Sequence, residues 1–261
     1  MIGDIHNLLD ALKLRHMRES VAQALEEAKK KNPSYGSFLL KLLQEELGDK
    51  RNRLIANRVK NCGLNEYWTL ETFPWHIQTC LAKYRKTIEE LSELDFIDRG
   101  ESAIFLGQAG VGKSGLASGI LIKALYAGRT GRAFQAQDLF EELGSSVADR
   151  TAKGLLKRLC RLDVLVIDEF GYLAPPNQNQ INNFFRLMDL RANKKSCIIT
   201  TNLGFSEWNK FLGSGPLTAA LLSRLLQQCH VVTFPANAIN LRDPKHKLPA
   251  RAPLPAILSN S

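Results

Sequence analysis

The stretch AIFLGQAGVGKS, residues 103–114, decides the fold class of this 261-residue chain. Its first four residues are apolar and predict a short strand, and SGLASGILIKALYA, residues 114–127, predicts a helix directly after it. The residues between follow the pattern G-x-x-x-x-G-K-[ST], in which glycines let the backbone amides turn toward phosphate oxygens at a helix N-terminus. The predicted phosphate-binding loop consists of Gly107, Gln108, Ala109, Gly110, Val111, Gly112, Lys113 and Ser114.

Two side chains of this loop have predicted chemical roles. Lys113 has the reach to contact the β- and γ-phosphates of ATP, and the Ser114 hydroxyl is a candidate ligand of Mg²⁺. A fortuitous glycine-rich turn is the alternative, but the strand before the loop and the helix after it speak against that alternative. ATP and Mg²⁺ are therefore the expected cofactors.

Beyond residue 100 short apolar strands alternate with helical segments. The predicted strands are residues 102–107, 132–136, 163–168, 197–201 and 230–234. This alternation is typical of a parallel sheet sandwiched by helices, so the predicted fold class is α/β, a P-loop NTPase.

The first 95 residues show helical periodicity instead and predict a small all-helical N-terminal domain. One helix is expected from about residue 4 to 30, where Pro33 and Gly36 break the pattern. A second is expected to end at Gly48 as its C-cap, and a third to run over 49–62. After an irregular connector, a further helix is expected near 76–94.

Three domains follow from these patterns. We expect residues 1–95 to be a helical domain, with DNA binding or oligomerisation as its predicted role, residues 96–242 to be the ATPase domain, and residues 243–261 to be a flexible, basic, proline-containing tail. Trp68, Phe73 and Trp75 in the connector are candidates for stacking on bases, but their more common role is to anchor a connector to a core.

Polar side chains follow two of the predicted strands. Asp168 and Glu169 come at the C-terminal end of the third strand, where active groups of parallel sheets gather. Asp168 is a candidate Mg²⁺ ligand, and Glu169 a candidate base for the attacking water. Asn202, after the fourth strand, is placed to touch the γ-phosphate or that water. The alternatives are an ordinary acidic turn for the pair and a helix cap for Asn202.

Arg224 lies near the end of the predicted helix PLTAALLSRLLQQ, residues 216–228. A lone arginine there is most often a surface charge that complements the helix dipole. The functional alternative is an arginine that reaches the γ-phosphate bound by a neighbouring subunit.

Thirty-five Lys and Arg residues against 26 Asp and Glu residues give a net charge of +9, which favours a polyanionic partner. The local basic clusters suit contacts with the phosphates of duplex DNA, although each cluster alone is more often a solvated helix face. The candidate DNA contacts are Lys50, Arg53, Lys60, Lys153, Lys157, Arg158, Lys194 and Lys195.

Other features bear on where the protein works. Five scattered cysteines without a C-x-x-C spacing argue against a disulfide framework or a zinc site. The chain has no long uncharged apolar run and no signal-peptide pattern at its start, so we expect a cytoplasmic protein without a membrane partner.

With these residues in view, the chain resembles the IstB-type transposition helper ATPases, which are AAA+ ATPases related to the DnaC-like helicase loaders. The stretches that carry the resemblance are LDFIDRGESAIFLGQAGVGKS, LDVLVIDEFGYL, IITTNLGFSEW and LLSRLLQQCHVV. The resemblance implies assembly as a ring or filament on duplex DNA, with ATP between subunits, and help to a partner transposase in choosing its target. It also implies that Asn202 is the first sensor and that Arg224 acts in trans.

Two positions depart from that family. Ser223 stands where the family usually has Asp before the trans-acting arginine. Asn240 stands where a second-sensor arginine is expected, and Arg242, two residues on, is the candidate replacement.

Three alternatives stay open at this point. A helicase loader would use the same ATPase site to grip a replicative helicase. A small-molecule kinase would need neither Glu169 nor a trans-acting arginine. A scaffold that binds ATP and barely hydrolyses it would fit the missing second-sensor arginine.

Overall fold

The computed structural model describes residues 2–64, 68–172, 175–213, 215–243 and 245 of the chain. The described residues form two compact units: one covers residues 2–57, and the other covers the described residues from 58 to 245. This division falls inside a helix, whereas the change of pattern in the sequence falls at residues 95–100. The structural boundary follows from which residues pack together, whereas the boundary in the sequence marks the start of the parallel sheet. Most of the predicted tail lies outside the described residues.

The N-terminal unit contains α1 (Ile2–Ala11), α2 (Arg15–Lys31) and most of α3 (Tyr35–Lys60). Its small core consists of Leu9, Met17, Val21, Ala24 and Leu42, with Ile5, Leu14, Leu25 and Phe38 packed around it. Glu46 is buried in this unit, where its carboxylate accepts a 2.8 Å hydrogen bond from the backbone N–H of Met17 at the start of α2. A carboxylate is favourable there because the first amides of a helix lack partners within it.

The sequence prediction was wrong about two helix boundaries in this unit. The single helix expected over residues 4–30 is divided at 12–14, where Lys13 adopts a left-handed φ of 59°. Gly48 does not end a helix, since α3 continues through it to Lys60. A mid-helix glycine costs about 1 kcal/mol relative to alanine. The packing of Leu42 and the ion pair between Arg53 and Asp49 at 2.6 Å offset that cost.

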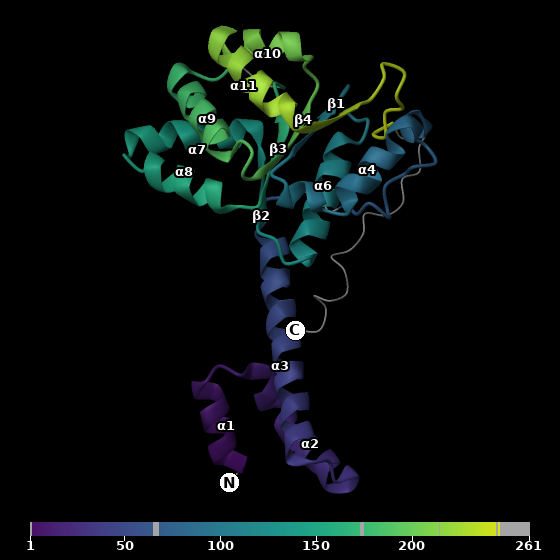
Figure 1. The fold of residues 1–261 in the computed structure, drawn as a ribbon, viewed down its shortest axis with the longest axis vertical. Coiled ribbons are helices and arrows are strands. Elements are labelled where there is room, and N and C mark those ends of the chain that lie inside the picture. Colours follow the sequence, from purple (N-terminus) through teal and green to yellow (C-terminus); the bar gives the residue numbers. More distant parts are fainter. Residues whose placement is uncertain (1, 65–67, 173–174, 214, 244, 246–261) are drawn as a thin grey trace. The chain divides into compact units, whose positions relative to one another are not determined.

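The second unit contains a five-stranded parallel sheet in the order β2-β3-β4-β1-β5 (Figure 1). The predicted fold class is therefore confirmed. The strands are β1 (Ser102–Leu106), β2 (Gly131–Gln135), β3 (Val164–Phe170), β4 (Ser196–Thr201) and β5 (Cys229–Thr233).

Helices cover both faces of this sheet. On one side α6 (Lys113–Tyr126) lies beside α4 (Arg85–Ser92), and on the other side lie α7 (Ala136–Ala148), α8 (Ala152–Arg161), α9 (Gln178–Arg191) and α11 (Gly215–Gln227) (Figure 1). The remaining elements are η1 (Thr79–Tyr84), α5 (Asp95–Asp98) and α10 (Phe205–Leu212). The helix expected near 76–94 is thus a 3-10 segment followed by a shorter α-helix. No helix within the described ranges has the length and apolar content needed to cross a bilayer.

Strand order brings the chemistry-bearing residues together. β4 lies between β3 and β1, with Leu106 opposite Thr201 and Phe170 also opposite Thr201. All three strands are parallel, so the loop after β1, the acidic end of β3 and the polar end of β4 meet at one edge of the sheet.

Candidate nucleotide site

The phosphate-binding loop joins β1 to the N-terminus of α6. Gly110 and Gly112 adopt φ angles of 80° and 103°, which side chains other than glycine rarely tolerate. The Lys113 ammonium donates hydrogen bonds to the carbonyls of Gly107 and Gln108 at 2.8 and 2.7 Å, so this side chain lies over the loop. Burial lowers the pKa of Lys113, while the charges of Asp168 and Glu169 oppose that shift. A bound phosphate would place an anion beside the ammonium and so offset the hydration that it loses on burial.

The segment after β5, residues 239–241, packs against the phosphate-binding loop. The backbone N–H of Leu241 donates to the carbonyl of Gly110 at 2.8 Å. The buried amide of Gln78 donates to the carbonyls of Val111 and Ile239 at 2.9 and 2.5 Å, so one side chain ties the loop to the C-terminal segment. Asn240 packs so closely on Gly110 that an added Cβ would lie 2.0 Å from its Oδ1.

Asp168 is the centre of a hydrogen-bond cluster. Its Oδ1 accepts from the Ser114 hydroxyl at 2.8 Å and from the Thr200 hydroxyl, and its Oδ2 lies 3.5 Å from Nε2 of Gln135. A hydroxyl and a carboxylate at hydrogen-bond distance are hard oxygen donors of the kind that Mg²⁺ prefers. Ser114 and Asp168 therefore fit the predicted metal ligands.

Glu169 has a strained backbone. Its φ is 57°, in the left-handed region that costs a residue with a side chain roughly 1–2 kcal/mol. The ladder between β3 and β4 is irregular between Ile167 and Phe170, so the acidic pair lies off the regular register. The backbone N–H of Glu169 donates to the Thr200 hydroxyl at 2.9 Å. This contact holds the turn that presents the Glu169 carboxylate, which is 41% exposed.

Thr200 belongs to the candidate site, and the sequence analysis did not single it out. Its side chain is completely buried, and its single hydroxyl accepts from Glu169 while it donates to Asp168. The sequence showed a polar residue at the end of a strand, but three such residues follow one another there. Only the register of β4 against β3 singles out Thr200.

A cavity of about 390 Å³ lies against the loop, which is within the range of small-molecule sites. Its lining includes Lys113, Ser114, Glu169, Asn202 and Arg242, together with Trp68, Ala109, Gly110, Gly112, Gly115, Tyr172, Thr201 and Leu241. A neighbouring cavity of about 240 Å³ adds Asp168 and Gln135 and shares Trp68, Ser114 and Glu169. The loop residues, the acidic pair and Asn202 thus converge on one site.

Arg242 lines this cavity beside Glu169. Its Nη2 lies 3.9 Å from Oε1 of Glu169, and its side chain is 73% exposed. Its backbone N–H donates to the Oδ1 of Asn240 at 2.9 Å, so the asparagine shapes the turn that precedes the arginine. Asn240 packs on the loop backbone, whereas Arg242 faces the cavity.

The aromatic connector packs against the same loop. The Phe73 ring is buried and would lie 2.9 Å from a Cβ added to Gly112, and Trp68 covers Gly115. Phe73 also contacts Trp75, with ring centroids 4.6 Å apart, and the Arg85 guanidinium lies 4.3 Å from the Trp75 ring centroid. These contacts agree with an anchoring role, and they place Trp68 in the wall of the nucleotide cavity.

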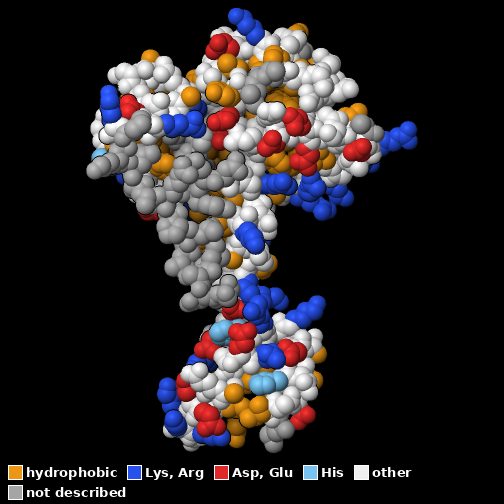
Figure 2. Space-filling view, turned by 180° about the vertical axis from the view of Figure 1, so that it is seen from behind, with side chains coloured by type: hydrophobic (Ala, Val, Ile, Leu, Met, Phe, Trp, Pro, Cys, Tyr) orange, Lys and Arg blue, Asp and Glu red, His pale blue; other side chains and the backbone are white. Residues whose placement is uncertain are grey.

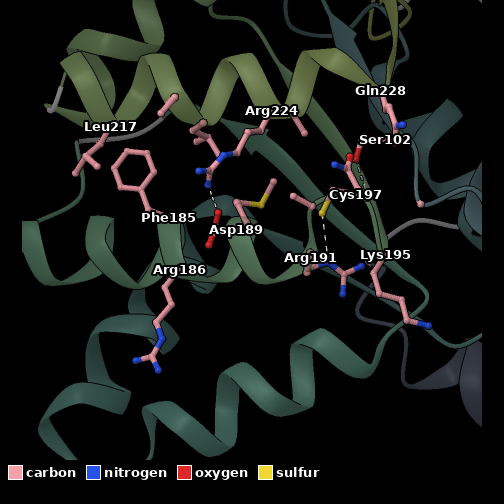
Figure 3. A pocket seen from close by; sticks show the side chains of 17 residues that line it. Ser102, Phe185, Arg186, Asp189, Arg191, Lys195, Cys197, Leu217, Arg224 and Gln228 are labelled. Carbon is pink, nitrogen blue, oxygen red and sulfur yellow. Dashed lines mark hydrogen bonds and ion pairs between the residues drawn. The ribbon is translucent and has the colours of Figure 1, made fainter.

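Arg224 lies apart from this site, at a third cavity of about 290 Å³ between α9 and α11 (Figure 3). Its guanidinium forms an ion pair with Asp189 of α9, and both side chains are about 60% exposed. Phe185, Leu217 and the buried Arg191 also line this cavity. The chain therefore does not bring Arg224 to its own phosphate-binding loop.

The candidate DNA contacts fall into two groups. The first group forms ion pairs with carboxylates of this chain. Arg53 pairs with Asp49 and Glu46, Arg158 pairs with Glu142, and Lys195 pairs with Asp163 at 2.6 Å. The other five are exposed, namely Lys50, Lys60, Lys153, Lys157 and Lys194. Of these, Lys153 and Lys157 lie one turn apart on α8, which is the strongest pair for contacts with two phosphates.

Comparison with known proteins identifies relatives along nearly the whole chain. A family model described as IstB-like ATP binding protein matches residues 7–247. The chain is 34% identical over 240 residues to a Pseudomonas aeruginosa protein named as an ATP-binding protein of insertion sequence IS21, with 92% of this chain and 89% of that protein covered. It is 32% identical over 239 residues to a similarly named Geobacillus stearothermophilus protein of insertion sequence IS5376, with 92% and 94% covered.

Solved structures with the same fold include the DnaC helicase loader, at 23% identity and a TM-score of 0.52, covering 68% of this chain and 99% of that one. Another is AMPPCP-bound DnaA from Aquifex aeolicus, at 20% identity and a TM-score of 0.52, covering 64% of this chain and 50% of that one. At these identities the likeness concerns the fold alone.

Proposed function

We propose a role in DNA transposition for this chain, which belongs to the family of IstB-like ATP binding proteins. In this role the protein binds and hydrolyses ATP, assembles as an oligomer on duplex DNA, and assists a transposase in target selection. The insertion-sequence names of its relatives support the link to transposition. The observation that carries the ATPase part is the convergence of Lys113, Glu169 and Asn202 on one cavity.

Each residue of the site has a proposed task. Lys113 and the loop amides hold the phosphates, and Ser114 and Asp168 would hold Mg²⁺, which supplies charge neutralisation on the phosphates when bound. Glu169 orients the attacking water and takes its proton, and Asn202 contacts the same water or the γ-phosphate. Arg242 senses the nucleotide from the C-terminal segment.

Arg224 completes the site of a neighbouring copy in this proposal. Its place at a different cavity from Lys113 supports the idea, because an arginine that acted within its own chain would have to line the same cavity. An arginine supplied in trans is worth about 10³–10⁵-fold in turnover in related phosphoryl-transfer systems. ATP is then a switch for assembly, and hydrolysis releases the oligomer.

A mixing experiment tests the trans role directly. Glu169→Gln alone and Arg224→Ala alone should each hydrolyse ATP at least 100-fold more slowly than wild type. An equimolar mixture should regain turnover, because a site formed by Glu169 of one variant and Arg224 of the other is complete. Lys86→Ala, an exposed lysine of α4, is the matched control for loss of a surface charge. A mixture as inactive as its components would refute the trans role.

A second experiment tests the DNA part. ATP turnover is measured at low salt with and without duplex DNA over a range of protein concentrations. Turnover that rises with both DNA and concentration supports assembly of sites between copies on DNA. Turnover that is linear in protein and indifferent to DNA contradicts it and favours a helicase-loader role or a self-contained kinase.

A further inference from the structure

The cavity between α9 and α11, which we call the Arg224 cavity, shares no lining residue with the nucleotide cavity among the described residues. Apolar side chains reach the surface of the second unit in small patches among charged ones (Figure 2). Scattered exposure of this kind is ordinary, whereas a concave volume with an apolar lining and a few polar groups is typical of a small-molecule site. The volume of about 290 Å³ has room for about ten non-hydrogen atoms, at roughly 30 Å³ for a group the size of water.

The apolar part of the lining comes from both helices. α9 contributes Phe185 and the buried Met188, and α11 contributes Leu217, Leu221 and Leu225. The three leucines follow one another at four-residue steps, so they share one face of α11. Phe185 and Leu217 lie at the same end of the cavity (Figure 3). The two helices therefore present an apolar slot to whatever enters between them.

The charged part of the lining is mostly positive. Four cationic side chains line the cavity, namely Arg186, Arg191, Lys195 and Arg224, and Asp189 is the carboxylate that faces them within the described lining. Asp189 pairs with Arg224, and Lys195 pairs with a carboxylate outside the lining. Two positive charges are then left without a counter-ion at the cavity, so an anion is the favoured ligand there.

Arg191 carries the part of this excess that water cannot screen, because it is only 1% exposed. Its guanidinium donates to the carbonyls of Leu159, Leu162 and Ser196 at 2.6–3.0 Å and to the Cys197 sulfur at 3.3 Å. Within the described part of the chain these partners include no carboxylate, so the buried charge has hydrogen bonds but no counter-ion. The attraction of such a charge for an anion is stronger than that of an exposed one, since little solvent lies around it.

We propose that the Arg224 cavity binds a small amphiphilic anion, an apolar chain that ends in one carboxylate, and that the bound anion holds Arg224. The chain lies against the leucine face of α11. The carboxylate replaces Asp189 at the Arg224 guanidinium, where the existing ion pair is exposed and therefore weak. The consequence for turnover rests on the proposed function: a held Arg224 does not reach the site of an adjoining copy, so the ligand inhibits hydrolysis.

Binding is tested with octanoate, whose ten non-hydrogen atoms match the volume, by calorimetry without ATP or DNA. We expect a dissociation constant below about 1 mM, which corresponds to roughly 0.4 kcal/mol for each non-hydrogen atom. Octylammonium and 1-octanol keep the chain but lack the negative charge, and they should bind at least about tenfold more weakly. Acetate keeps the charge but lacks the chain, and it should give no measurable binding.

Two exposed alanines of α11 provide a matched pair of variants. Ala220 lines the cavity and Ala219 does not, so Ala220→Trp should weaken octanoate binding about tenfold or more, and Ala219→Trp should leave it within about threefold. Asp189→Asn removes the carboxylate that competes for Arg224 and should tighten binding about threefold to tenfold. Unchanged thermal unfolding shows that the variants are folded.

Several results would overturn the site. These are no binding of octanoate, equal affinity for octanoate and octylammonium, unchanged affinity in Ala220→Trp, and failure of Asp189→Asn to tighten binding. Each is measured without nucleotide, so none depends on the proposed ATPase activity.

The hold on Arg224 is tested by ATP turnover with octanoate at ten times its dissociation constant. About nine sites in ten are then occupied, so turnover of the wild type should fall about tenfold, while octylammonium at the same concentration should change it little. Octanoate that binds without slowing turnover overturns the hold on Arg224. The mixing experiment with Glu169→Gln and Arg224→Ala contains no octanoate, so failure of the trans role itself is recognised separately.

Discussion

Replacement of Thr200 by Val should slow ATP hydrolysis while leaving ATP binding nearly intact. Valine keeps the volume of the buried side chain but removes the hydroxyl that accepts from Glu169 and donates to Asp168. A hydrogen bond to a charged group contributes about 1.5–3 kcal/mol, and a buried N–H left without a partner costs about 1–3 kcal/mol. These effects act on a turn that already carries roughly 1–2 kcal/mol of strain at Glu169.

The expected loss follows from relaxation of that turn. If the productive conformation of Glu169 becomes about 1.4–2.8 kcal/mol less favourable, maximal turnover falls about 10- to 100-fold. Lys113 and the loop amides are untouched, so the dissociation constant for ATP should change less than threefold. The assay is steady-state turnover at saturating ATP and Mg²⁺, with ATP binding measured separately by calorimetry.

Two control variants separate positioning from general damage. Thr200→Ser keeps the hydroxyl and should retain turnover within about threefold. Thr218 is also completely buried, but its hydroxyl has no hydrogen-bond partner among the described residues, so Thr218→Val should leave thermal stability unchanged or slightly raised. Wild-type turnover in Thr200→Val, or equal losses in turnover and ATP affinity that Ser does not rescue, would refute the positioning role.

Three further predictions concern other parts of the second unit. Arg242→Ala should weaken ATP binding or turnover about tenfold, measured by the same two assays, because its guanidinium is near the Glu169 carboxylate. Lys153→Ala with Lys157→Ala should reduce the slope of log affinity against log salt for duplex DNA by roughly 2. Although burial alone would raise it, hydrogen bonds from Lys195 and Thr130 lower the pKa of Asp163 to about 2. The resulting stability is present above about pH 4 and lost as pH falls toward 2, at most about 2 kcal/mol, and urea unfolding of Asp163→Asn should lack that part of the acid dependence.

The first two of these predictions have matched control variants. Lys86→Ala with Lys210→Ala removes two exposed charges from other helices and should leave the salt slope unchanged. Arg242→Lys keeps the charge and should recover part of the loss. A full acid dependence in Asp163→Asn, or wild-type ATP affinity and turnover in Arg242→Ala, would show that these residues do not have the stated roles.

Local sequence patterns were sufficient to predict the parallel sheet and most residues of the candidate site. The loop from Gly107 to Ser114 is contiguous, and its flanking strand and helix have unmistakable periodicity, so its structure follows from neighbours in the chain. Asp168 and Asn202 were found because each ends an apolar strand. Parallel strands place their C-terminal ends at one edge, which makes spatial proximity predictable without coordinates.

Features that depend on packing could not be predicted in this way. The continuity of α3 through Gly48 depends on core contacts of Leu42 and on an ion pair one turn along. The choice of Thr200 among three consecutive polar residues depends on the irregular register between β3 and β4. The pairing of Arg53, Arg158 and Lys195 with nearby carboxylates likewise came from tertiary structure, and it reduces the surface available for DNA phosphates.

The distribution of positive charge supports the proposal that hydrolysis depends on a neighbouring copy. Among the described residues of one chain, the cationic side chains that line the nucleotide cavity are Lys113 and Arg242. Lys113 belongs to the loop that holds the ground-state phosphates, and Arg242 is 73% exposed and close to the Glu169 carboxylate. The charge that develops in phosphoryl transfer needs a further donor that is desolvated when the reaction occurs. In the proposed assembly Arg224 of an adjoining copy would supply that donor, since within its own chain Arg224 pairs with Asp189 at another cavity. If Arg224 left Asp189 and bound the ATP phosphates held by an adjoining copy, hydrolysis would depend on assembly.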